Sequence, residues 1–485
     1  MEEPVIATSQ EISRRAALMT GAALFGWGLT GSSARSAEAP RVDPFHDPTY
    51  SLLRTREDLV KHLRDEAREA QEKPRAVNGI SVTGLPVAVS ELDDTVTKIL
   101  RESGIPGAAV CIAKNDRLVC TRGYGRASLV GNVPVEPTMP ATIMSVSKPL
   151  TVTAALMLVR DGKLRLDDLA FQILKDGPLL APGQSVDPRQ NKITIQQLMS
   201  HTSGLFNAVE ILNDPARFRA LAQRGHIQLI HKKIAQNDLI RVGMGQKLLF
   251  APGRKFAYSG QGMQVLARVV EKLSGWRLDR YIRRFVFAPL GVRSYCVGSY
   301  LSESQYRQFL RPNREQFYAM CPAMYNKDQN RHHVQDLTNV PYLSWGGADA
   351  CGWGVVSAID LLRWVTYFFK LVGPELAKAS TEQPWVVNDK GERVQGGMGL
   401  GWIPLKNSRG GPPGITHEGG WPGEGSLAER RANGASLAAL VNSDDVPHVK
   451  QIYSAARRFV SKLRAAPAGS PEWKDYGFAE AAFSG

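Results

Sequence analysis

The sequence predicts an α/β (α+β) protein in which an antiparallel sheet is flanked by helices and accompanied by a second, mainly helical lobe. Two strands separated by a short turn occur early in the chain, at residues 108–113 and 118–125. Strands recur near the C-terminus, and a helix closes the chain. Strands and helices at both ends of the chain indicate one sheet that is completed by the two termini.

Local signals justify the individual elements. Pro149 is tolerated only in the first turn of a helix, and Gly162 stands in the usual position of a helix stop, so the apolar run between them forms a buried helix. Residues 206–245 are expected to be helical and basic. Residues 295–345 are polar and aromatic, and we expect them to form an irregular insertion beside the site. The remaining expected helices are residues 92–102, 193–199, 263–273, 358–371 and 448–463, and the later strands are residues 399–404, 414–419, 425–430 and 435–442.

Residues 1–39 have the features of an export signal. Arg14 and Arg15 precede a weakly apolar run, and Ala37 and Ala39 flank a cleavage point. The segment looks like a twin-arginine signal, which implies a bacterial protein that is exported, already folded, to the periplasm. Residues 40–87 are expected to be an N-terminal extension with a charged helix near residues 55–73, residues 88–463 the main domain, and residues 464–485 a C-terminal tail.

The chain is strongly basic, with a net charge of +14. Such a charge can attract nucleic acid, but the sequence has no Lys/Arg cluster interleaved with aromatic residues and no zinc-finger or P-loop spacing. We therefore expect no nucleic-acid partner. In the periplasm, an anionic cell-wall or membrane surface is the expected neighbour. A role of the charge in solubility alone is an equally good interpretation, and the oligomeric state stays open.

The five cysteines are too sparse for a disulfide framework. If Asn115 and Asp116 form a two-residue turn, Cys111 and Cys120 face each other on adjacent strands, within reach of a disulfide. The sequence leaves two alternatives open for this pair, a disulfide and two buried thiols.

Ser145 and Lys148 precede the buried helix in a Ser-x-x-Lys pattern. On a helix, residues three apart share a face, so the two side chains can exchange a proton. A serine hydroxyl is a poor nucleophile until a base takes its proton, and a lysine amine can act as that base. A lysine at the head of so apolar a helix is not expected to be a simple solvated charge.

Three further segments accompany this pair: Tyr258 on a loop before the helix at 263–273, the tetrapeptide His417-Glu418-Gly419-Gly420, and residues 200–205, Ser-His-Thr-Ser-Gly-Leu. In their order along the chain, these segments and the Ser145–Lys148 pair resemble the serine β-lactamase and penicillin-binding-protein superfamily. The likeness is strongest to its class C branch, which includes family VIII carboxylesterases and D-amino-acid-specific peptidases. It covers residues 88–463 and implies a β-lactamase/transpeptidase-like fold without a metal or an organic cofactor.

The resemblance also implies roles for single residues. Ser145 corresponds to the nucleophile, Lys148 to the residue that shares its proton, and Tyr258 to the phenol that completes the base network and protonates the leaving group. The backbone N–H groups of Ser145 and Gly420 correspond to the oxyanion donors. On the same strand, His417 and Gly419 are expected to contact the substrate, with His417 placing a hydrogen-bond donor beside the acyl group. Glu418 should point away, because side chains alternate along a strand, and His201 is expected to be structural.

One position departs from the family pattern. Penicillin-recognising members usually carry Asn where this chain has Gly260, and that Asn donates to the amide side chain of the substrate. The sequence therefore predicts an exported serine hydrolase that forms a Ser145 acyl-enzyme, with small carboxylic esters as the leading substrates. The alternatives are a D-alanyl peptidase or β-lactamase, and a non-catalytic wall-binding protein.

Neither Gly-x-Ser-x-Gly nor His-Glu-x-x-His occurs, so an α/β-hydrolase and a zinc hydrolase have no support.

Overall fold

A computed structural model provides the coordinates of the chain. It describes residues 75–84, 89–127, 134–175, 186–207, 229–230, 233–234, 236–292, 294–297, 323–326, 331–334, 349–388, 390–406, 413–421, 424–443, 445–463 and 465. The predicted export signal, the charged helix near residues 55–73, most of the 295–345 insertion and nearly all of the C-terminal tail lie outside these residues.

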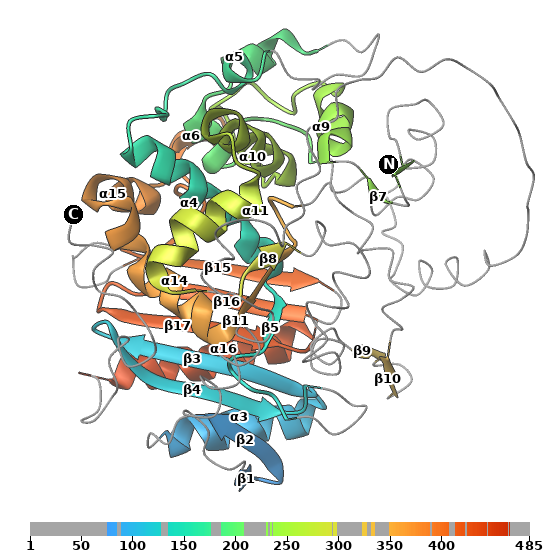
Figure 1. Cartoon of the computed structure of the whole chain (residues 1–485), viewed down its shortest axis with the longest axis vertical. Coiled ribbons are helices and arrows are strands. Elements are labelled where there is room, and N and C mark those ends of the chain that lie inside the picture. Colours follow the sequence, from blue (N-terminus) through green and yellow to red (C-terminus); the bar gives the residue numbers. More distant parts are fainter. Residues whose placement is uncertain are drawn as a thin grey trace, which may run out of the picture. The chain divides into compact units, whose positions relative to one another are not determined.

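An eight-stranded antiparallel sheet is the centre of the fold (Figure 1). The central pair joins β3 from the first half of the chain to β17 from the end, from Ala108 opposite Val441 to Lys114 opposite Ala435. The prediction of one antiparallel sheet completed by both ends of the chain is therefore confirmed. In spatial order the strands are β1 (Arg75–Val77), β2 (Ile80–Gly84), β4 (Arg117–Gly125), β3 (Gly107–Lys114), β17 (Ala435–Val441), β16 (Glu424–Arg430), β15 (Gly414–Trp421) and β14 (Ile403–Leu405).

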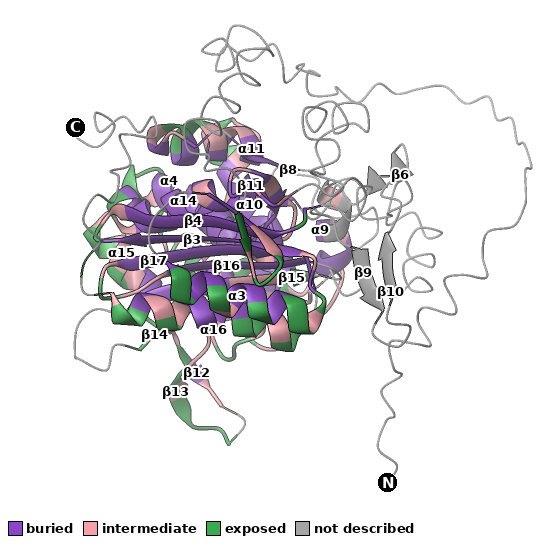
Figure 2. Ribbon diagram, turned by 90° about the horizontal axis from the view of Figure 1, so that it is seen from below, coloured by how far each residue is buried: buried purple, intermediate pink, exposed green. Residues whose placement is uncertain are grey.

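Helices cover both faces of this sheet (Figure 2). The helices α3 (Ser90–Ser103) and α16 (Val446–Lys462) pack together on one face, and α14 (Ala358–Val372) packs on the other, with α4 (Ser147–Arg160) and α10 (Gly260–Ser274) beyond it. The two faces of β17 divide accordingly: Leu437, Ala439 and Val441 belong to one apolar core, whereas Ala438 and Leu440 belong to the other. This double burial explains the continuous apolar sequence of the central strands.

Smaller elements complete the described part of the chain, and none of its helices is long and apolar enough to cross a membrane. The short helices are α5 (Ala170–Ile173), α6 (Ile195–Met199), α9 (Gln236–Met244), α11 (Leu278–Tyr281), α15 (Pro374–Thr381), the 3₁₀ turns η3 (Met144–Val146), η4 (Pro188–Lys192) and η6 (Ala288–Leu290), and the π-helical η5 (Ile282–Phe287). The minor sheets are β5 (Pro140–Thr142) with β11 (Gly354–Ser357) and β8 (Cys296–Val297), β12 (Trp385–Val387) with β13 (Arg393–Gln395), β6 (Leu229–Ile230) with β7 (Lys233–Ile234), and β9 (Ala323–Asn326) with β10 (Arg331–Val334).

Two expected elements differ in the structure. In the segment 206–245, residues 208–228 lie outside the described residues, and the described remainder contains a short hairpin of β6 and β7 followed by the helix α9. The strand expected at 399–404 is reduced to β14, and Gly401 before it adopts a left-handed conformation, φ 74°, which a strand does not allow.

The sheet begins earlier than the domain boundary that we predicted at residue 88. The strands β1 and β2 fall within the range assigned to the N-terminal extension, yet Val82, Thr83 and Gly84 of β2 pair with β4. Gly84 allows the close approach, because a side chain there would overlap the backbone of Thr121. The hairpin therefore forms the edge of the sheet and belongs to the same domain.

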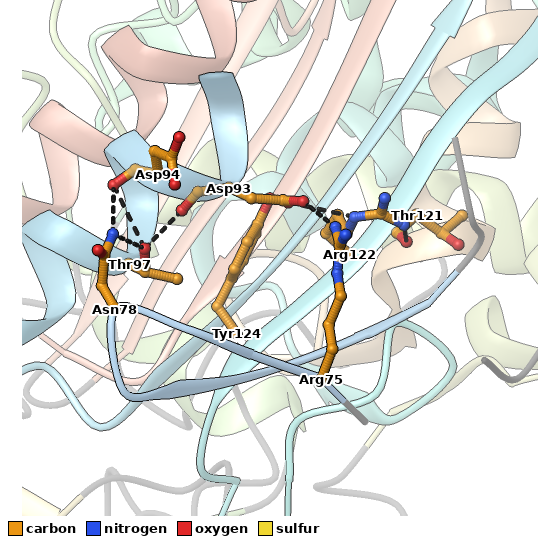
Figure 3. Close-up of polar contacts among 8 residues, drawn as sticks. All are labelled: Arg75, Asn78, Asp93, Asp94, Thr97, Thr121, Arg122 and Tyr124. Atoms are coloured by element: carbon orange, nitrogen blue, oxygen red, sulfur yellow. Dashed lines mark hydrogen bonds and ion pairs between the residues drawn. The ribbon is translucent and has the colours of Figure 1, made fainter. Parts of the chain in front are cut away.

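The β1–β2 hairpin is tied to the domain by a polar network around Asp93 of α3 (Figure 3). The Asp93 carboxylate accepts hydrogen bonds from Tyr124 Oη, at 2.9 Å, and from Arg122 Nε, at 3.2 Å, both on β4. Arg75 on β1 completes the network with an ion pair to the same carboxylate. Asp93 and Arg122 are each 1% exposed, so their charges depend on each other for compensation.

Cys111 and Cys120 are free thiols on opposite faces of the sheet. Asn115 and Asp116 do form the predicted turn, both with positive φ. However, the register shifts between Ile112 and Ala113, so Cys120 pairs with Ile112 and not with Cys111. The disulfide alternative is therefore wrong, because a β-bulge moves one of the two cysteines to the other face.

Candidate active site

Ser145 lies in the 3₁₀ turn η3, immediately before α4, as the position of Pro149 predicted. The turn is held from two sides. Ile143 donates its backbone N–H to Gly354 O, at 2.9 Å, and accepts a hydrogen bond from Ser426 Oγ at its carbonyl, at 2.7 Å. Met144 has a φ of 42°, an uncommon conformation for a side chain of this size. These contacts keep a partly exposed serine at the head of a buried helix.

Lys148 lies on the same face of this turn, and its Nζ is 3.0 Å from Ser145 Oγ. A second hydrogen bond, of 2.7 Å, joins Nζ to the backbone oxygen of Cys351, a residue that precedes β11. The Lys148 residue is only 5% exposed. The predicted pair is therefore in contact, and the Cys351 carbonyl aims the amine at the serine hydroxyl.

Tyr258 approaches Lys148 from the loop before α10, and Lys148 Nζ lies over its ring, 4.8 Å from the centroid. His201 supports this loop from the other side, with its ring centroid 4.6 Å from that of Tyr258. Ser259 donates its N–H to His201 Nδ1, at 3.0 Å, and Ala257 donates to His201 O, at 2.9 Å. His201 thus binds the residues on both sides of Tyr258.

His417 on β15 completes the group, with its ring centroid 6.3 Å from that of Tyr258. Glu418 points to the opposite face as predicted, where its carboxylate bonds Arg457 of α16, at 3.2 Å. Burial and then the positive charge of Lys148 lower the pKa of His417 to about 3. Burial, then the positive charge of Lys148, and then the neighbouring His417 lower the pKa of His201 to about 3. Both imidazoles are therefore neutral at pH 7.

Gly419 brings β15 against the nucleophile. A Cβ at this position would lie 2.5 Å from Ile143 O and 2.9 Å from the amide nitrogen of Ser145. The strand β14 pairs with β15 only from Gly414 to Thr416. After Thr416, no other strand among the described residues pairs with this edge of β15. The backbone of β15 at Gly419 thus lies against the Ser145 amide. That Ser145 N and Gly420 N are the oxyanion donors stays a prediction.

Substitution of Gly419 with alanine is expected to lower kcat/KM for any substrate that Ser145 attacks by about 100-fold or more, the effect of losing one oxyanion donor. The added methyl group would overlap Ser426 Oγ, Ile143 O and the Ser145 amide nitrogen, so the nucleophile turn and the serine that holds it must shift. Gly420→Ala is the matched control, because the nearest atom to its Cβ is Glu424 O, at 3.7 Å. Equal losses in the two variants would show that the contact of Gly419 with the nucleophile turn is unimportant.

Sequence reasoning missed three contributors to the site. His201 was expected to be structural, and the spacing did not reveal that it supports the Tyr258 loop. Asn207 accepts a hydrogen bond from Gly260 N at its Oδ1, at 3.0 Å, and so holds the backbone at the start of α10. The Cys351 carbonyl had no sequence signal, because a backbone group is independent of residue type.

No group of three His, Cys, Asp or Glu side chains suited to a metal occurs in the described part.

The large antiparallel sheet, the helices on its faces and the Ser145–Lys148 pair together define the class of protein: the serine β-lactamase and penicillin-binding-protein superfamily. The family model described as Beta-lactamase matches residues 92–459, which is most of the chain. The protein belongs to this family, as the motifs predicted.

Individual relatives share part of the sequence or the fold. Protein flp of Staphylococcus aureus (strain MW2) is 27% identical over 203 residues, which cover 42% of this chain and 37% of that protein. Acyltransferase mokF of Monascus pilosus is 26% identical over 236 residues, 46% of this chain and 55% of that protein. The chain thus spans little more than a third of the first of these relatives.

Two solved structures illustrate the likeness in fold. The D-amino acid amidase from Ochrobactrum anthropi SV3 superposes with a TM-score of 0.56 at 18% identity, covering 76% of this chain and 98% of the amidase. A penicillin-binding protein from Bacillus halodurans gives a TM-score of 0.56 at 19% identity, covering 75% of this chain and 99% of that protein. At these identities the likeness concerns the fold.

Proposed function

We propose that this β-lactamase-family hydrolase cleaves small carboxylic esters through an acyl-enzyme on Ser145. The observation that carries the proposal is the 3.0 Å contact between Lys148 Nζ and Ser145 Oγ, with Nζ held by the Cys351 carbonyl. A nucleophile and a base within hydrogen-bond reach, with the base oriented by a third group, is the arrangement that acyl transfer needs.

The proposed reaction has two steps. Ser145 Oγ attacks the ester carbonyl while Lys148 Nζ takes the hydroxyl proton, and the alkoxide leaves with a proton supplied through Tyr258. The carbonyl oxygen becomes negative and accepts hydrogen bonds from the Ser145 and Gly420 amides. Water then attacks the acyl-enzyme, and the acid leaves. No step requires a metal or an organic cofactor.

A second candidate is hydrolysis of an amide in a D-amino acid derivative, a cell-wall peptide or a β-lactam. It draws support from the names of proteins with the same fold, which include a D-amino acid amidase and a D-stereospecific amidohydrolase from Streptomyces sp.. Gly260, which lacks the side-chain donor of penicillin-recognising members, favours the ester. A wall-binding protein without activity is disfavoured because Ser145, Lys148 and Tyr258 are all present and adjacent.

We further propose export through the twin-arginine route, supported by Arg14, Arg15 and the apolar run that follows them. The periplasm would then be the site of action. The net charge of +14 supports contact with an anionic cell-wall or membrane surface there.

Intact-mass spectrometry tests the proposed function. After incubation with p-nitrophenyl butyrate, the wild type is expected to carry one butyryl group and Ser145→Ala none. Ser461→Ala, which changes an exposed serine of α16, should be acylated like the wild type. A benzylpenicillin adduct that also depends on Ser145 would move the assignment to the second candidate. Absence of any Ser145-dependent adduct or turnover would contradict both.

A further inference from the structure

The imidazole of His417 lies on β15, beside the ring of Tyr258. The side chain of Glu418 points to α16 and bonds Arg457, and Gly419 lies against the amide of Ser145. Because side chains alternate along a strand, His417 shares the face of Gly419. Its ring is next to Tyr258, and the residue is 3% exposed. The imidazole is therefore a buried group on the wall of the proposed site.

The backbone determines which ring nitrogen carries the proton. Nδ1 of His417 lies 2.8 Å from the carbonyl oxygen of Glu418. A carbonyl oxygen only accepts hydrogen bonds, so Nδ1 must bear the hydrogen. In a neutral ring Nε2 then has a lone pair and no hydrogen. This Nε2 is buried and has no hydrogen-bond partner among the described residues. It lies on the ring edge away from the Glu418 carbonyl.

The surroundings keep the ring neutral. The titratable groups that face it are Lys148, His201 and Tyr258. Burial and the positive charge of Lys148 lower the pKa of His417 to about 3, so the ring is neutral at pH 7. His201 adds no positive charge, because its own pKa is also about 3.

We propose that His417 Nε2 is a hydrogen-bond acceptor for the acyl part of the substrate, and that the site selects acyl groups with an uncharged N–H or O–H donor near the scissile carbonyl over acyl groups with a carboxylate. The proposal rests on the proposed acyl-enzyme function. It corrects our expectation from the sequence, which placed a donor at His417. A carboxylate offers only acceptor atoms, so beside Nε2 it leaves two buried acceptors unpaired.

The first test measures the tautomer without reference to activity. In a protein labelled with ¹⁵N-histidine, long-range ¹H–¹⁵N spectra are expected to show His417 with hydrogen on Nδ1 alone at pH 7, assigned by its loss in His417→Gln. A hydrogen on Nε2, or a protonated ring, would overturn the inference whatever the enzyme hydrolyses.

The second test compares three p-nitrophenyl esters that differ in one group: the N-acetylglycine ester with an N–H donor, the N-acetylsarcosine ester in which a methyl replaces that hydrogen, and the hemisuccinate with a carboxylate. We expect the wild type to prefer the first by about tenfold or more in kcat/KM over each of the others, because a site that pairs with a donor rejects analogues that lack it. His417→Leu should remove the preference, and His417→Lys should favour the hemisuccinate.

The outcomes separate this inference from the proposed function. Ser145-dependent turnover with equal kcat/KM for the three esters, or a preference that survives in His417→Leu, would overturn the inference and leave the acyl-enzyme intact. If none of the esters acylates Ser145, the proposed function fails and the inference about substrates fails with it.

Discussion

Replacement of Lys148 by methionine is expected to lower acylation of Ser145 by about 10³-fold or more, within the range that a general base contributes together with its positioning. Methionine has a similar length but no proton acceptor, and it leaves the Cys351 carbonyl without the amine that it bonds. Stopped-flow release of p-nitrophenolate, combined with intact-mass spectrometry, measures the acylation step directly.

Lys148→Arg is the matched control, because arginine keeps the charge and the hydrogen-bond donors but remains protonated. If Lys148 acts as the base, the arginine variant should be as slow as the methionine variant. Recovery of acylation to within tenfold of the wild type in Lys148→Arg would mean that the residue contributes only charge and donors, and the mechanism would need another base.

Asp93→Asn is expected to lower the free energy of unfolding by about 3–5 kcal/mol, the usual loss when one partner of a buried ion pair is removed. The change removes the negative charge that Arg122 faces in the protein interior, where Arg122 is 1% exposed. Denaturation by guanidinium chloride, followed by circular dichroism, gives the midpoint and slope from which this loss is calculated.

The control for this prediction is Arg75→Gln, which removes the outer partner of the same carboxylate. The side chain of Arg75 is 46% exposed, so its loss should cost about 1 kcal/mol or less. In addition, Arg122→Met combined with Asp93→Leu should lose less stability than Asp93→Leu alone, since the double change leaves no buried charge. Equal losses for Asp93→Asn and Arg75→Gln would contradict the importance of the buried pair.

Much of the fold could be predicted because its signals are local. Pro149 and Gly162 mark the ends of the buried helix, and the structure places α4 at Ser147–Arg160. Three of the four later strands and the terminal helix were expected within a few residues of their positions, whereas β14 is shorter than expected. The β1–β2 hairpin was missed because its two short strands at the sheet edge give a weak periodic signal.

The candidate site, like the fold, could be predicted from the sequence only in part. The contact between Ser145 and Lys148 was predictable because residues three apart on a helical turn necessarily share a face. The approach of Tyr258 and His417 was expected only from the order of motifs in a known superfamily. The support of the Tyr258 loop by His201 and the state of the His417 ring could not be predicted, since both depend on backbone atoms that the sequence does not place.

By itself, the sequence determined the reactive pair, the boundaries of most elements and the family, because each follows from residues that are close along the chain or recur in a set order. The tertiary structure alone decided the face on which Cys120 lies, the carbonyl that aims Lys148, and the nitrogen that His417 presents. A bulge of one residue moves a side chain across the sheet. The Cys351 carbonyl comes from 203 residues further along the chain, and such contacts exist only after the sheet and its helices have packed.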